Sequence, residues 1–116
     1  MPRIYCNPTS RREATNAYKY AHRHDSQADE VYSLQCAKGQ IDPNVRETYT
    51  AWHLLTEQLS KVRGFMDRDP ELAGEALDAA ISLFDAYAAP RDKTAWAYLR
   101  RKLKAFRGCW RISEGH

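Results

Sequence analysis

The stretch DPNVRETYTAWHLLTEQLSKVRGFM, residues 42–66, decides the fold of this 116-residue chain. Asp42 stands before Pro43, an order in which the aspartate caps a helix and the proline takes its first position. Apolar side chains then recur at alternating steps of four and three residues, which keeps them on one helix face. They are Val45, Tyr49, Trp52, Leu55, Leu59, Val62 and Met66. The stretch therefore predicts a long helix with one buried face.

The sequence downstream predicts two more helices. Asp69-Pro70 repeats the cap and opens a helix that runs to Tyr87 and is ended by Pro90. A last helix is expected from about Asp92 to Arg107, with Gly108 as its stop. The apolar positions expected to be buried in these helices are Ala73, Leu77, Ala80, Ile81, Phe84, Trp96, Leu99, Leu103 and Phe106.

Upstream, residues 10–38 contain no Gly or Pro, and Ser10 with Glu13 has the spacing of a capping box. Because Asp25 and Ser26 could cap a new helix, this segment is either one bent helix or two short ones. Residues 1–9 are expected to form an irregular lead-in. The apolar and small residues expected on the buried face are Ala14, Ala17, Tyr18, Ala21, Ala28, Val31, Tyr32 and Leu34.

These segments predict an all-α fold, a compact bundle of four to five helices with mostly antiparallel neighbours. The length fits a single helical domain over residues 1–116, and no segment alternates like a strand. No apolar run approaches the roughly 20 residues of a membrane span, and no signal peptide is visible. The cysteines, Cys6, Cys36 and Cys109, form no CxxC pair, which predicts reduced thiols in a cytoplasmic protein.

Neither a cofactor nor a metal is expected. The sequence has no phosphate-binding loop and only five glycines, so the usual nucleotide cradles are absent. His22 and His24 could ligate a metal only together with distant cysteines, which is a weak pattern. Tyr20 lies off the apolar stripe and near Arg23, so it is the tyrosine most suited to stacking on a nucleic-acid base.

Charge is sorted by segment along the chain, although the net charge is only +3. Residues 91–111 hold eight cations and one carboxylate, whereas residues 69–89 hold carboxylates and no cation. At 100° per residue most of these cations share one stripe of the last helix. The candidate partner-binding residues are Lys93, Arg100, Arg101, Lys104, Arg107 and Arg111. Alternatively, the preceding acidic helix neutralises part of this charge, or the face is merely solvated.

The sorted charge predicts a non-enzymatic binding protein whose basic last helix docks onto nucleic acid or onto the acidic surface of a nucleoprotein complex. Small regulators encoded by phages, including anti-CRISPR inhibitors of host defence, are often of this kind. Base reading by a helix-turn-helix is disfavoured, because the last helix begins with apolar residues around Trp96. DNA, RNA and protein targets stay open, as does the oligomeric state.

A second hypothesis makes the chain an enzyme. Arg46 and His53 are seven apart and share one helix face, a spacing that resembles the Arg-x4-6-His motif of HEPN-type ribonucleases. The resemblance implies that a dimer brings two motifs together and that Arg46 and His53 act on the scissile phosphate. Imidazole can transfer a proton near neutral pH, and Arg offsets phosphate charge. Glu47 departs from the small polar residue usual in that family, and Glu57 can pair with His53 at i+4.

Overall fold

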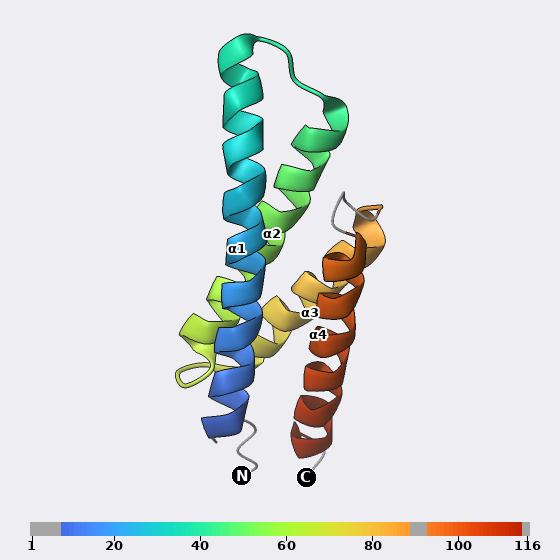
Figure 1. The fold of residues 1–116 in the computed structure, drawn as a ribbon. Helices are drawn as coiled ribbons and strands as arrows, with labels where there is room; N and C mark the ends of the chain where they lie inside the picture. The colour runs from blue at the N-terminus through green and yellow to red at the C-terminus, as the bar shows by residue number, and fades with distance from the viewer. Residues whose placement is uncertain (1–7, 89–92, 115–116) are drawn as a thin grey trace.

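The computed structural model describes residues 8–88 and 93–114, and their side chains over residues 11–88 and 93–109. These residues form four helices, α1 (Pro8–Lys38), α2 (Pro43–Phe65), α3 (Pro70–Ala86) and α4 (Lys93–Glu114), shown in Figure 1. Since the described ranges contain no strand, the all-helical fold and a helix count of four to five are confirmed. A single domain over residues 1–116 and mostly antiparallel neighbours stay predictions.

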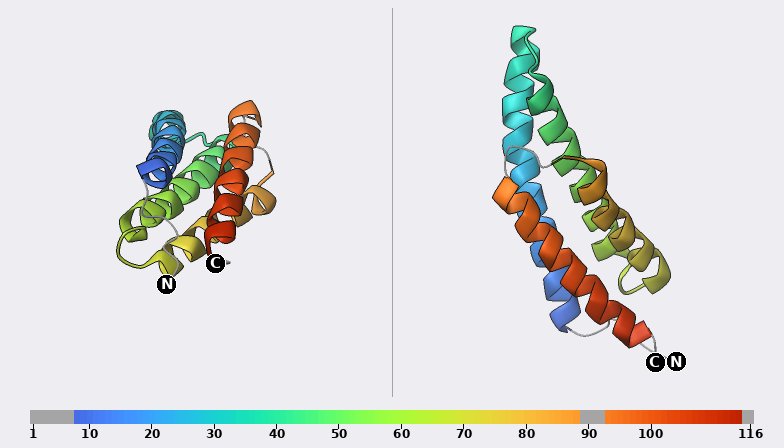
Figure 2. Two further views of the ribbon diagram at one scale, coloured as in Figure 1. Left: turned by 90° about the horizontal axis from the view of Figure 1, so that it is seen from below. Right: turned by 90° about the vertical axis from the view of Figure 1, so that its right-hand side faces the viewer.

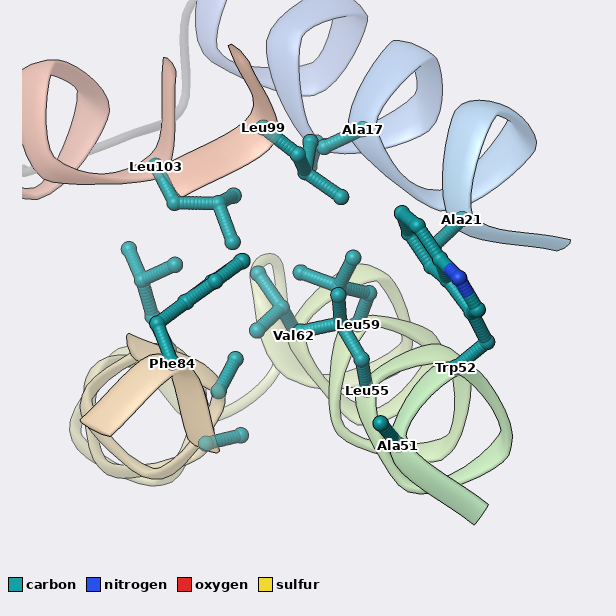
Figure 3. Packing of buried hydrophobic residues seen from close by; sticks show 14 of the residues in the cluster. Ala17, Ala21, Ala51, Trp52, Leu55, Leu59, Val62, Phe84, Leu99 and Leu103 are labelled. Atoms are coloured by element: carbon teal, nitrogen blue, oxygen red, sulfur yellow. The ribbon is translucent and has the colours of Figure 1, made fainter. Parts of the chain in front are cut away.

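The helix predicted from residues 42–66 forms as expected. The backbone N–H of Asn44 donates to the Asp42 side chain at 2.9 Å, and Pro43 opens α2. The stripe that follows is buried, apart from Tyr49, which is half-buried. Trp52 and Leu55 are fully enclosed, and α2 thus supplies the central part of the core (Figure 3).

α1 is one continuous helix, which decides between the two alternatives for residues 10–38. It already begins at Pro8, so the expected lead-in over residues 1–9 is wrong for its last two residues, and Ser10 lies inside the helix rather than at its cap. Pro8 suits the first helical position, which explains the earlier start. α1 ends at Lys38, and Gly39 follows it with a φ of 71°, a conformation that favours glycine. The N–H of Gln40 donates to the Gln35 carbonyl at 3.1 Å.

In α3 and α4 most of the predicted core positions are buried, whereas Ile81 and Phe106 are half-buried, and the ends of both helices differ from the prediction. The N–H of Leu72 donates to the Asp69 side chain at 3.2 Å, so the second predicted cap is confirmed. α3 ends at Ala86, and Pro90, the expected breaker, lies outside the described residues. α4 continues through Gly108 to Glu114, so Gly108 as a stop is wrong. Gly108 does not have the positive φ that a glycine stop needs.

The molecule is elongated, with extents of 55 × 22 × 18 Å. α1 packs along α2, α3 packs on α2, and α4 contacts both α3 and α1. The far end of the α1–α2 hairpin extends beyond α3 and α4 (Figures 1 and 2). Two residues predicted to be buried lie in this part of α1 and are exposed, Val31 by 41% and Leu34 by 63%.

The core lies where all four helices meet. Side chains from each helix point into one cluster, in which Leu99 and Leu103 of α4 face Leu55, Leu59 and Val62 of α2 (Figure 3). Trp52 and Trp96 meet edge to face, with ring centroids 5.0 Å apart. In the described ranges no helix is both long enough and apolar enough for a bilayer crossing.

Candidate nucleic-acid interface

α4 concentrates positive charge. From Lys93 to Cys109 it contains cations and no carboxylate. The cations are Lys93, Arg100, Arg101, Lys102, Lys104 and Arg107. Four of the six are exposed, while Arg100 and Arg107 are half-buried. Arg111 belongs to the same helix, but its side chain lies outside the described ones.

The two half-buried arginines face α3. Arg107 donates from Nε to Asp78 Oδ1 at 2.8 Å and from Nη2 to Asp78 Oδ2 at 3.2 Å, and its side chain is only 12% exposed. Arg100 Nη2 lies 3.5 Å from Asp85 Oδ1. The acidic helix therefore neutralises part of the positive charge of α4 at both arginines, as the alternative predicted, whereas partner binding by Arg100 and Arg107 stays a prediction.

A glycine lets the Arg107 guanidinium lie close to α3. Gly74 is buried one turn before Asp78, and a Cβ built on it would lie 3.4 Å from both terminal nitrogens of Arg107. A longer side chain would displace the guanidinium from its carboxylate. We call Gly74, Asp78 and Arg107 the α3–α4 clasp.

The first half of α1 adds cations that the sequence reasoning did not include in the site. Arg12, Lys19 and Arg23 are exposed there, and Glu13 is the one carboxylate among residues 11–24. From Asp25 onward α1 carries more carboxylates than cations. This change of sign within one helix is the signal that could have found them, because the α1 residues that line the space against α4, from Glu13 to Tyr20, lie in its first half.

A groove of about 190 Å³ lies between α1 and α4, with lining residues from both helices. Buried Ala17, Leu99 and Leu103 line its floor, and Ala17 and Leu99 approach each other in Figure 3. Aromatic rings form much of its walls, with Tyr20 on α1 and Tyr98 on α4 at a centroid distance of 5.2 Å.

Polar groups surround these rings. Lys102 Nζ lies 5.6 Å from the centroid of Tyr98, and Glu13 and Asn16 line the α1 wall. At 100° per residue, Arg12 and Arg23 lie within about 40° of Asn16 around α1. The groove thus combines aromatic walls with a basic rim on both helices.

The residues of the ribonuclease hypothesis lie on α2, away from this groove. Arg46 is exposed near the far end of the hairpin, and His53 is half-buried between α2 and α1. His53 Nδ1 lies 3.4 Å from Asp25 Oδ2, and Nε2 lies 3.2 Å from Glu57 Oε1. The ring also stacks on Tyr49, with centroids 5.3 Å apart. Both imidazole nitrogens therefore face carboxylates of the protein.

The pKa of Asp25 is shifted by its surroundings in this region. Its side chain is 14% exposed, and burial raises the pKa of the carboxyl above 3.8, although the charge of His53 and the hydrogen bond to it act in the opposite direction. Asp25 thus joins α1 to α2 through its contact with His53.

The described residues contain no group of three side chains suited to a metal ion. His24 stacks on Trp52 at 4.6 Å between centroids, and His22 stacks on Tyr18 at 5.6 Å, so both rings take part in packing within α1 and against α2. Cys36 and Cys109 are exposed, and Cys6 lies outside the described residues.

Comparison of the chain with protein-family models, with curated proteins and with solved structures finds no match.

Proposed function

We propose that this chain is a non-enzymatic binding protein that docks onto nucleic acid through the exposed cations of α4 and of the first half of α1. The observation that carries the proposal is α4 itself, a helix with four exposed cations and no carboxylate from Lys93 to Cys109. Such a face attracts a polyanion at long range and releases the counterions of the phosphates that it contacts.

The α3–α4 clasp divides the cations into two groups. Arg107, and more weakly Arg100, contact α3. Among the described residues Arg101 and Lys104 have no ion-pair partner, so their charges are available to phosphates. Arg can hold a phosphate with two donors, and Lys acts as a mobile point charge.

Reading of base edges in a duplex groove is not part of the proposal. Trp96, near the start of α4, is buried in the core, and the exposed residues at that end combine Lys93 and Thr94 with Ala97 and Tyr98, so it offers few polar side chains to base edges. An acidic surface of a nucleoprotein complex would be attracted by the same charges and is the competing target.

A role as a phage-encoded inhibitor of host defence and a cytoplasmic location stay predictions.

The HEPN-type ribonuclease remains the alternative from another class, but its geometry is less favourable. Carboxylates lie 3.4 Å and 3.2 Å from the two ring nitrogens of His53. A phosphate approaching His53 would meet their negative charge, and the imidazole already has partners on both sides. Cleavage of RNA by the purified protein that is lost in His53→Ala would favour this alternative.

The test of docking is a titration of a labelled 12-nucleotide single strand, followed by fluorescence anisotropy at several salt concentrations. We expect Lys104→Glu to weaken binding and to reduce the salt slope, whereas Lys61→Glu, which makes the same charge change at an exposed position of α2, has little effect. Binding that does not depend on salt, or that is equally affected by the two variants, contradicts the proposal. Absence of binding to any free strand, with retention on a nucleoprotein complex, favours the competing target.

A further inference from the structure

The groove between α1 and α4 has the size of a site for a single flat ring system. Its volume of about 190 Å³ is well below the roughly 300–1,000 Å³ of pockets for drug-sized ligands. The floor is apolar, and Tyr98, which is 39% exposed, presents part of its ring to an incoming group. An aromatic ligand could stack there without any rearrangement of the core.

Charge around the groove indicates what such a ring is attached to. Lys102 lines one wall, and Arg101 is exposed on the same helix, about 60° around it from Tyr98. Arg12 and Arg23 are exposed on α1 close to the opposite wall. Cations on both sides of an aromatic slot fit a ligand that carries negative charge on each side of a planar group, as a nucleotide within a strand does.

The groove also contains groups that can contact the edge of a base. Asn16 offers both donors and an acceptor, and the Glu13 carboxylate accepts from amino and imino groups. Bases in a duplex are stacked and paired, so a whole base enters such a groove at the lowest cost from an unpaired strand, where no pairing has to be broken.

We propose that the α1–α4 groove holds one unpaired nucleobase of a single strand, stacked on the exposed part of the Tyr98 ring, which Tyr20 supports from α1, while Lys102 and the neighbouring cations contact the flanking phosphates. This inference rests on the proposed function and narrows it to single-stranded nucleic acid.

The test compares three labelled 12-mers by anisotropy at one salt concentration: a mixed-sequence single strand, an abasic strand with the same number of phosphates, and a duplex. We expect the single strand to bind about tenfold more tightly than the abasic strand, because stacking of one base is lost in the latter. Tyr98→Ala should bring the intact strand to the abasic level, whereas Tyr98→Phe keeps the ring and should bind like the wild type.

Tyr32→Ala is the matched control, because Tyr32 lies on the second half of α1 and stacks on Tyr49 instead of lining the groove. Circular dichroism at 222 nm establishes that each variant keeps its helices. Equal binding of intact and abasic strands, or unchanged binding by Tyr98→Ala, overturns the groove assignment while leaving salt-dependent docking in place. If none of the three probes binds, the proposed function fails and the groove assignment fails with it.

Discussion

The α3–α4 clasp predicts that two aspartates on the same helix contribute very differently to stability. Asp78 accepts two hydrogen bonds from Arg107, whose side chain is 12% exposed. Asp85 lies 3.5 Å from Arg100, and its own side chain is 74% exposed. We therefore expect Asp78→Ala to be destabilising and Asp85→Ala to be nearly neutral.

The size of the effect follows from burial. A hydrogen bond to a charged group contributes about 1.5–3 kcal/mol, and an exposed ion pair about 0.2–1 kcal/mol. The arginine of the clasp is mostly buried, but Asp78 is 43% exposed, so the loss lies near the lower end of the first range. We expect about 1.5–2 kcal/mol for Asp78→Ala, equivalent to a Tm lower by about 7 °C, since 1 kcal/mol shifts the Tm of a domain of this size by about 4 °C. Asp85→Ala should cost less than about 0.5 kcal/mol.

The assay is urea unfolding followed by circular dichroism at 222 nm, with the slope m checked for constancy among the variants. Arg107→Met completes a double-mutant cycle, because methionine keeps an apolar chain over Gly74 and removes the charge that Asp78 compensates. In that background Asp78→Ala should lose most of its effect. Equal unfolding free energies for Asp78→Ala and Asp85→Ala, or additive effects in the cycle, would refute the clasp as a stabilising contact.

Three further predictions follow from burial, backbone conformation and charge. Leu55→Ala should lower the free energy of unfolding by about 3 kcal/mol because the side chain is fully buried, whereas Leu34→Ala should lower it by less than about 0.5 kcal/mol because Leu34 is 63% exposed. Urea unfolding measures both losses, and similar values would contradict the described core. Gly39→Ala should lower the free energy of unfolding by about 1 kcal/mol because Gly39 has a φ of 71°, whereas Gly108→Ala should raise the Tm because it lies in a helix with open space around the new Cβ. Thermal unfolding in which Gly108→Ala lowers the Tm and Gly39→Ala does not would contradict the described backbone. Asp25 has a raised pKa in the folded state, so the stability that it contributes is fully present below its unfolded pKa near 3.8 and is lost as the pH rises through the folded pKa. Asp25→Asn should therefore gain stability relative to the wild type as the pH rises through that interval. A difference in unfolding free energy between the two proteins that stays constant from about pH 3.5 to 6.5 would contradict this prediction.

The helices could be predicted from the sequence wherever caps and periodic apolar residues agree. Asp42-Pro43 and Asp69-Pro70 mark the starts of α2 and α3, and the α2 stripe is buried as its spacing indicates. A spacing rule cannot say how far a neighbouring helix extends. Val31 and Leu34 keep a helical spacing with the buried alanines of α1, yet they are exposed because α3 and α4 end short of them.

The candidate site was predicted in part. The excess of cations on α4 is visible in the sequence, but which of them face outward depends on the rotation of α4 against α3, which no local pattern determines. Gly108 shows the same limit, since glycine is permitted at a helix end without requiring one. The groove and the contribution of Arg12 and Arg23 depend on contact between segments about 80 residues apart, and therefore needed the three-dimensional arrangement.

The division of cations between α3 and the outer face decides how binding and folding can be separated in experiments. The clasp at Arg107 is one of the contacts that hold α4, beside its buried Leu99 and Leu103, so it influences where α4 lies along the α1–α4 groove. Charge reversal at Arg107 would place a carboxylate against Asp78. It would therefore alter the position of α4 and its contacts with phosphates at the same time, so the two effects could not be separated. Charge reversal at Lys104 leaves the clasp intact and alters only the outer face. A variant series confined to Arg101, Lys102 and Lys104 therefore reports on the docking surface, whereas the same series at Arg100 and Arg107 reports on the attachment of α4.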